Sequence, residues 1–167
     1  MNRIELSDII VVDPFAEQYR RLLHGLKPKT ATIALNSMQD GIVQITDILQ
    51  WHQSIQHIHI VSHASPGELK LGSIQLNLQT LPYYTELLST WFPRRLQGSA
   101  SISVYACRLA TGNAREEFLT KLHQLTGANV HMSSRPDGNH RWKVDMSVPS
   151  TTAPYRSPFS VLPFRGD

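Results

Sequence analysis

The sequence predicts an α/β fold, organised as a three-layer α/β/α sandwich around a mostly parallel sheet. Short apolar runs alternate with segments of helical periodicity along the chain, and this alternation is typical of parallel strands connected by helices. The 167 residues are 41% hydrophobic and 17% charged, which fits one folded domain with a core and argues against disorder.

The first half of the chain alternates predicted strands and helices. Short apolar runs at 8–13, 30–36 and 56–63 are typical of buried parallel strands. Residues 14–26 and 40–53 carry apolar side chains at helical spacing, so each is expected to form a helix with one buried face.

The second half begins with a different element. A hairpin is predicted at 68–77, where apolar and polar residues alternate around Gly72-Ser73. Residues 113–127 predict a helix that ends at Gly127. The remaining predicted elements are a mostly helical stretch at 78–96, strands at 101–106 and 128–134, and a short last strand at 141–146.

The chain is predicted to divide into a domain at 1–148 and a proline-rich C-terminal arm at 149–167. The N-terminal residues lack the apolar stretch of a signal peptide, and no window approaches the ~18 apolar residues of a membrane helix. The single cysteine, Cys107, excludes an internal disulfide. We therefore expect a cytoplasmic protein without a membrane span, with export by a non-classical route left open.

The charge pattern argues against a nucleic-acid partner. The formal net charge is +3, and the basic residues are scattered apart from doublets at 20–21 and 94–95. They form no basic stripe with interleaved aromatic residues, and no glycine-rich phosphate-binding loop is present. The sequence predicts neither nucleic-acid binding nor a cofactor.

Two reactive side chains lie where predicted strands end. His63 ends the 56–63 run and Cys107 follows the 101–106 run. The carboxyl ends of parallel strands meet at one edge of the sheet, so both residues are expected at that edge, where α/β sites form. A thiol and an imidazole are the minimal machinery of nucleophilic acyl transfer. The competing interpretation is an inert, buried cysteine.

The neighbours of these two residues fit the same chemistry. The positive end of the predicted helix at 113–127 would favour the thiolate of Cys107. The backbone N–H groups of Ala64 and Cys107 are candidate donors to an oxyanion. The small residues Ser65 and Gly67 leave room for a substrate backbone beside the pair.

A histidine cluster at residues 52–63 offers a metal site as an alternative. His57, His59 and His63 share strand parity and therefore one face of the sheet. Six residues of strand nevertheless span ~20 Å, which is too far for one metal ion. No Cys or carboxylate partner has a metal-ligand spacing. The sequence predicts no metal site, and His57 and His59 are expected to be packed side chains near the start of the strand.

The two strand-and-loop blocks carry a family resemblance. "IHIVSHA" is an apolar block ending in His and a small residue, and "SISVYAC" is one ending in a small residue and Cys. The pair resembles the caspase-like (clan CD) cysteine peptidases, which include caspases, metacaspases and separase. Ordered segments from residue 8 to about 145 also resemble the bacterial domain of unknown function found near the N-termini of large repeat-containing surface proteins.

The resemblance implies a caspase-like sandwich with His63 and Cys107 as its catalytic dyad. The bacterial family usually has Gly after the His, where this chain has Ala64. Alanine keeps the backbone N–H but adopts positive φ less readily than glycine. Metacaspases carry an Asp two residues before the Cys, and that residue is Tyr105 here.

The charged residues of the sequence do not decide which residue the enzyme would prefer before the cleaved bond. Asp137, Asp145 and Glu68 would form an acidic pocket for Arg or Lys, whereas two arginines, Arg108 and Arg135, would form a basic one. The sequence thus predicts a cysteine endopeptidase that cleaves itself or a partner protein. The alternative is an inactive interaction module of the same fold, which binds protein or peptide through the cleft or the C-terminal arm.

Overall fold

The structure is a computed structural model that describes most of the chain. The described residues are 5–14, 16, 26–62, 64–65, 68–106, 113–133, 144, 146–149 and 158, with only the backbone for 64–65.

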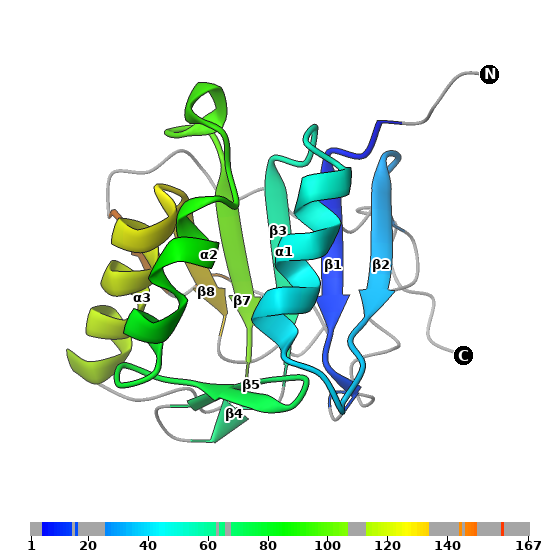
Figure 1. The fold of residues 1–167 in the computed structure, drawn as a ribbon. Coiled ribbons are helices and arrows are strands. Elements are labelled where there is room, and N and C mark those ends of the chain that lie inside the picture. Colours follow the sequence, from blue (N-terminus) through cyan, green and yellow to red (C-terminus); the bar gives the residue numbers. More distant parts are fainter. Residues whose placement is uncertain are drawn as a thin grey trace, which may run out of the picture.

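Within the described residues, the centre of the fold is a six-stranded sheet (Figure 1). The strands are β1 (Asp8–Val12), β2 (Thr30–Ala34), β3 (His57–Val61), β7 (Ser101–Tyr105), β8 (Asn129–Ser133) and β9 (Met146–Val148). Their order across the sheet is β2-β1-β3-β7-β8-β9. Neighbouring strands are parallel except β8 and β9, which pair antiparallel. The prediction of a mostly parallel α/β sheet is confirmed.

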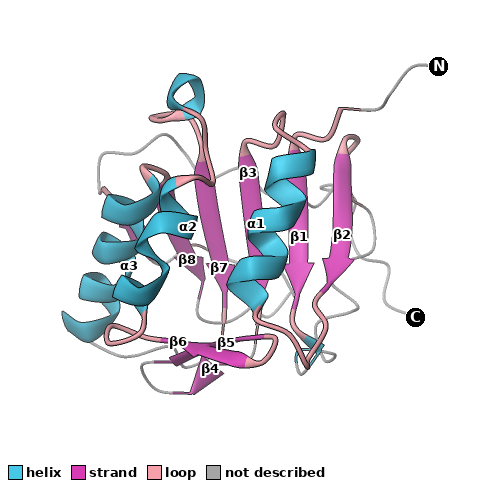
Figure 2. Cartoon of the chain, viewed as in Figure 1, coloured by secondary structure: helices cyan, strands magenta, loops and turns pink. Residues whose placement is uncertain are grey.

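A second, small sheet follows β3 in the chain. It consists of β4 (Ala64–Ser65), β5 (Glu68–Leu71) and β6 (Ile74–Leu76), paired antiparallel in that order. The turn between β5 and β6 contains Gly72 and Ser73, so the predicted hairpin is confirmed. Figure 2 shows this small sheet lying across the carboxyl ends of the parallel strands.

The described helices cover one face of the large sheet (Figure 1). They are α1 (Gly41–Trp51), α2 (Thr85–Ser89) and α3 (Asn113–Thr126), with short 3-10 turns η2 (Leu81–Tyr84) and η3 (Arg94–Leu96). The predicted helix at 14–26 falls mostly outside the described residues. The described part of the chain therefore shows one helical layer on the sheet, and the third layer of the sandwich stays a prediction.

Local sequence explains where α1 begins and which face it buries. The carboxylate of Asp40 accepts hydrogen bonds from the backbone N–H groups of Ile42 (2.8 Å) and Val43 (3.1 Å), which caps the helix. Ile42, Ile45 and Leu49 recur at helical spacing and are buried against the sheet.

The two faces of the large sheet differ in chemistry. Because side chains alternate along a strand and parallel partners stay in register, each face collects one residue parity from every strand. The face toward the helices is apolar, with Ile9, Val11, Ile58, Ile60, Ile102, Val104, Val130 and Met132 in the core. The opposite face, called the polar face below, carries Asp8, His57, His59, Ser101, Ser103, Tyr105, His131 and Ser133.

Two predicted elements differ from the structure. The last strand was expected at 141–146, but β9 begins at Met146, where antiparallel pairing with β8 sets Met132 opposite Met146. Residues 141–143 and 145 lie outside the described residues. The mostly helical stretch at 78–96 is broken into η2, α2 and η3, because Pro82 and Pro93 remove backbone donors near its two ends.

Candidate functional site

The carboxyl ends of β3 and β7 lie side by side. Val61 and Tyr105 are register partners in neighbouring parallel strands. The backbone N–H of Ser62 donates to the Tyr105 carbonyl (3.2 Å), and the N–H of Ala106 donates to the Ser133 carbonyl (3.1 Å). Sheet pairing therefore continues for one residue beyond both strands, up to the positions just before His63 and Cys107 in the chain.

The predicted dyad itself lies outside the described residues, as do Gly67 and Asp137. The charged candidates Arg108, Arg135 and Asp145 also lie outside them. Of the other predicted site residues, Ala64 and Ser65 form β4, which pairs antiparallel with β5 through Ala64–Leu69 and Ser65–Glu68. The small sheet therefore begins directly after His63 in the chain.

Two residues that the sequence analysis did not single out fix the main chain around this edge. Asp13 follows β1 and is fully buried. Its N–H donates to the Val61 carbonyl (2.9 Å), and its Oδ2 accepts the N–H of Gly72 (2.8 Å). Ser62 is also buried, and its hydroxyl donates to the Lys70 carbonyl in β5. The signal that could have found Asp13 is a carboxylate directly after an apolar strand run, at the edge where α/β sites form.

Close backbone contacts hold the small sheet in place. Gly72 has φ of 62°, and a Cβ there would lie 2.2 Å from the Gln39 carbonyl oxygen. A Cβ on Gly41, the first residue of α1, would lie 2.6 Å from the backbone of Leu71. Only glycine fits these two contacts, so the small sheet packs directly on the start of α1.

The polar face carries three histidines with hydrogen-bond partners. His59 is fully buried, with Nε2 at 2.9 Å from Asp8 Oδ2 and Nδ1 at 3.1 Å from the Tyr105 hydroxyl. His57 Nδ1 lies 2.7 Å from the Ser101 hydroxyl. In a similar pairing across β8 and β9, His131 Nδ1 lies 2.8 Å from the Ser147 hydroxyl. His57 and His59 are packed side chains of β3, as predicted.

Burial sets the ionisation of this face. Burial lowers the pKa of His59 below its ordinary 6.5, and the nearby Asp8 carboxylate, which raises it, does not compensate. Burial and the neighbouring imidazoles of His57 and His59 lower the pKa of His131. Burial raises the pKa of Asp8, but hydrogen bonds to His59 and Ser7 outweigh burial and leave it below 3.8.

The described residues offer no ready metal site. Among them, no group of three or more His, Cys, Asp or Glu side chains is arranged to hold a metal ion. Both ring nitrogens of His59 already have hydrogen-bond partners.

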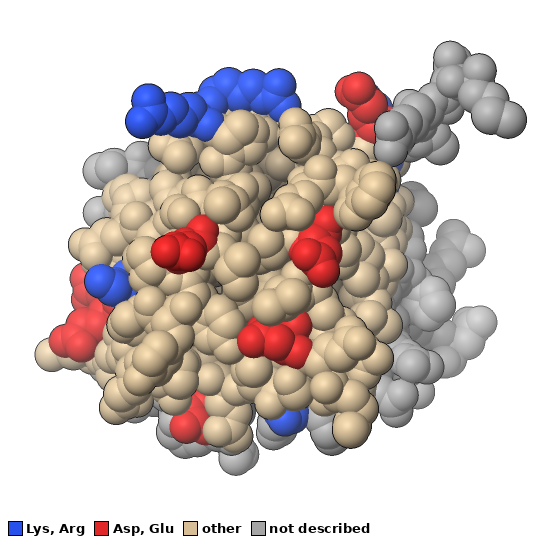
Figure 3. All heavy atoms as spheres, in the orientation of Figure 1, with Lys and Arg blue, Asp and Glu red and all other residues tan. Residues whose placement is uncertain are grey.

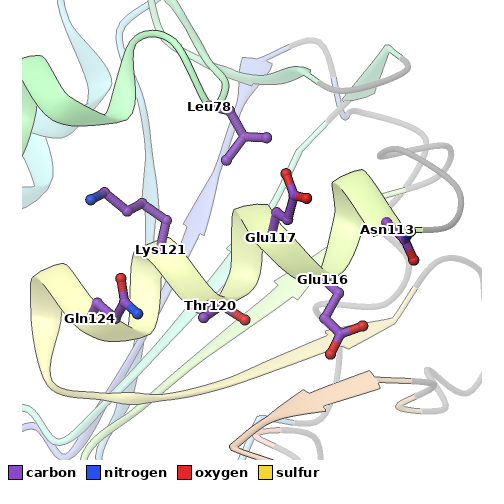
Figure 4. A pocket seen from close by; sticks show the side chains of 7 residues that line it. All are labelled: Leu78, Asn113, Glu116, Glu117, Thr120, Lys121 and Gln124. Carbon is purple, nitrogen blue, oxygen red and sulfur yellow. The ribbon is translucent and has the colours of Figure 1, made fainter.

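A groove of about 450 Å³ runs along α3 beside Leu78. It is lined by Leu78, Asn113, Glu116, Glu117, Thr120, Lys121 and Gln124. Figure 4 shows Glu117 and Lys121 on the side of the helix toward Leu78. Both signs of charge are present, so the groove selects no single charge on a ligand. On the molecular face seen in Figure 3, acidic and basic groups are both present and are scattered over mostly uncharged surface.

Comparison with known protein families assigns this chain to one of them. The family model described as a domain of unknown function, DUF4347, matches residues 9–161. The chain belongs to this family. A search among curated proteins found no match. None of the described helices of this DUF4347 chain is long and apolar enough to cross a membrane.

Proposed function

We propose that the chain is a caspase-like cysteine endopeptidase with His63 and Cys107 as its dyad. The observation that carries the proposal is the register of β3 and β7. Ser62 and Ala106 continue the sheet at the carboxyl ends of adjacent parallel strands, and His63 and Cys107 are the next residues in the chain. The strand order reverses between β1 and β3, next to the β3–β7 pair, and α/β sheets form sites near such reversals.

The small sheet supports the same proposal. The sequence pattern that resembles caspase-like peptidases includes a hairpin after the His. In this structure β4, β5 and β6 follow His63 in the chain. Asp13 and Ser62 tie this sheet to the strand ends. Main chain on both sides of position 63 is therefore fixed, as a site with preorganised donors requires.

The proposed reaction follows from a thiol and an imidazole. The Cys107 thiolate attacks the carbonyl carbon of a peptide bond, and the backbone N–H groups of Ala64 and Cys107 hold the resulting oxyanion. His63, protonated by the thiol, gives its proton to the leaving amine, and a thioester remains on Cys107. His63 then takes a proton from water, which attacks the thioester and releases the acid and the thiol. The substrate is a protein partner or a segment of the chain itself.

Activity-based labelling tests this proposal. Acyloxymethyl ketone probes carrying Arg, Lys or Asp are added to the full chain and to the Cys107→Ala and His63→Ala variants. The matched control is His52→Ala, because His52 is the residue directly after α1 and belongs to neither strand end. We expect one probe class to label the wild type and His52→Ala, with labelling lost in Cys107→Ala and reduced at least about a hundredfold in His63→Ala. The preferred probe identifies the residue before the cut. Labelling that persists without Cys107, or that is indifferent to His63→Ala, would contradict the dyad.

The second candidate is an inactive interaction module of the same fold. The groove along α3 favours it, because this mostly apolar surface lies along a helix face, carries polar side chains of both charges and has space for a bound peptide. This candidate gains support if no probe labels the wild-type chain while its thermal unfolding shows that it is folded.

A further inference from the structure

Three side chains form a hydrogen-bonded chain across the polar face. Asp8 lies at the start of β1, His59 in the middle of β3 and Tyr105 at the end of β7. Asp8 Oδ2 lies 2.9 Å from His59 Nε2, and the Tyr105 hydroxyl lies 3.1 Å from His59 Nδ1. The His59 and Tyr105 rings are also stacked, with centroids 6.0 Å apart and an interplanar angle of 27°. This series of hydrogen bonds thus runs from the amino edge of the sheet toward the carboxyl edge.

The chemistry of the three side chains fixes which atom donates each of these hydrogen bonds. The Asp8 carboxylate only accepts hydrogen bonds, so His59 Nε2 carries a proton and donates it. In a neutral imidazole the other nitrogen is then an acceptor, and the Tyr105 hydroxyl donates to Nδ1. One tautomer of His59 therefore satisfies both neighbours, and Asp8 selects it.

Tyr105 is held by β3 at two points. Its hydroxyl reaches His59, and its carbonyl accepts the N–H of Ser62 (3.2 Å). Tyr105 as a whole is 1% exposed. Tyr105 is two positions before Cys107 and Ser62 is one position before His63. Contacts between Tyr105 and β3 therefore contribute to the relative placement of the two strand ends that lead to the proposed dyad.

We propose that His59 is a positioning residue for the thiol of Cys107, acting through Tyr105. This inference rests on the proposed function and adds a buried support to its dyad. His59 keeps the Tyr105 ring and the end of β7 in one place, so that the segment after Ala106 starts from a fixed position. Asp8 contributes by holding His59 in the tautomer that accepts from Tyr105.

Alkylation of the single cysteine tests this role in the full chain. The second-order rate of reaction of Cys107 with iodoacetamide is measured by mass spectrometry across a series of pH values. The variants are Tyr105→Phe, which removes one hydroxyl, and His59→Gln. The matched control is His131→Gln, because His131 is also a buried histidine of the polar face but bonds Ser147. Thermal unfolding of each variant checks that it is folded.

We expect Tyr105→Phe and His59→Gln each to slow alkylation at neutral pH by about three- to tenfold, the range that one lost hydrogen bond can produce. The midpoint of the pH profile should move to higher pH, because the thiolate then faces a less well placed imidazole. His131→Gln should change neither quantity. If the two test variants only lower the unfolding temperature and keep the wild-type rate and midpoint, the positioning role is wrong.

Adding His63→Ala to the series separates this inference from the proposed function. If alkylation slows in His63→Ala but not in His59→Gln or Tyr105→Phe, the dyad stands and the positioning role fails. If it slows in His59→Gln and Tyr105→Phe but not in His63→Ala, the dyad fails and the support of Cys107 by His59 stands.

Discussion

Replacing Gly72 by alanine is expected to destabilise the protein by about 3 kcal/mol. Gly72 has φ of 62°, which an alanine adopts at a cost of about 1 kcal/mol or more. The added Cβ would lie 2.2 Å from the Gln39 carbonyl oxygen. That oxygen accepts the N–H of Ser73 (2.8 Å) and the Gln44 side-chain amide (2.9 Å), so it cannot move away cheaply.

The matched control for this prediction is Gly98→Ala. Gly98 also has positive φ, 94°, but no atom lies within 4 Å of the Cβ that would be added. Urea unfolding of both variants separates backbone strain, which they share, from the steric overlap at Gly72. Equal losses of unfolding free energy in the two variants would show that the contact between Gly72 and Gln39 is not tight.

Acidification below pH 6.5 is expected to destabilise the fold through the histidines of the polar face. The pKa of His59 and that of His131 are lower in the folded chain than the ordinary 6.5. Between the lowered value and 6.5 the unfolded chain binds more protons, so stability is complete above pH 6.5 and falls as pH decreases toward the folded pKa. Each histidine contributes at most about 1.4 kcal/mol per pH unit in this window, and fully buried His59 should contribute the larger share.

Unfolding free energies measured by urea titration at steps from neutral to acidic pH check this expectation. His59→Gln and His131→Gln should each flatten the profile below pH 6.5, and the double variant should flatten it most. The pKa of Asp8 is also lowered, but from 3.8, so its stabilisation is lost only in a separate, more acidic window. If the free energy of unfolding of the wild type stays constant below pH 6.5, protonation of the buried histidines does not destabilise the fold and the prediction is wrong.

Much of the architecture was predictable because local sequence encodes it. The runs "DIIVV" and "HIHIV" form β1 and β3. Short runs with continuous or alternating apolar residues bury their apolar side chains when they pair within a sheet. Glycine at Gly72 and Gly127 marked a turn and a helix end, where positive φ is required. The position of β9 was not predictable, because a short edge strand is defined by its pairing with β8.

The proposed site was predictable only as an edge of the sheet. The order of strands and loops indicated that the residues after β3 and β7 belong together, and the register of Val61 with Tyr105 agrees with that order. The supports of this edge could not be predicted. The Asp13 carboxylate and the Gly72 N–H are 59 positions apart in the chain, and no periodicity connects such residues.

The sequence by itself determined a mostly parallel α/β sheet, the hairpin after the third strand and the positions of His63 and Cys107 in the chain, just after β3 and β7. Only the tertiary structure decided which groups hold the ends of those two strands. His59 lies 51 positions from Asp8 and 46 from Tyr105, yet parallel pairing brings all three onto one buried face. Local patterns specify which residues form strands, whereas hydrogen-bond partners on that face depend on how strands from distant parts of the chain align.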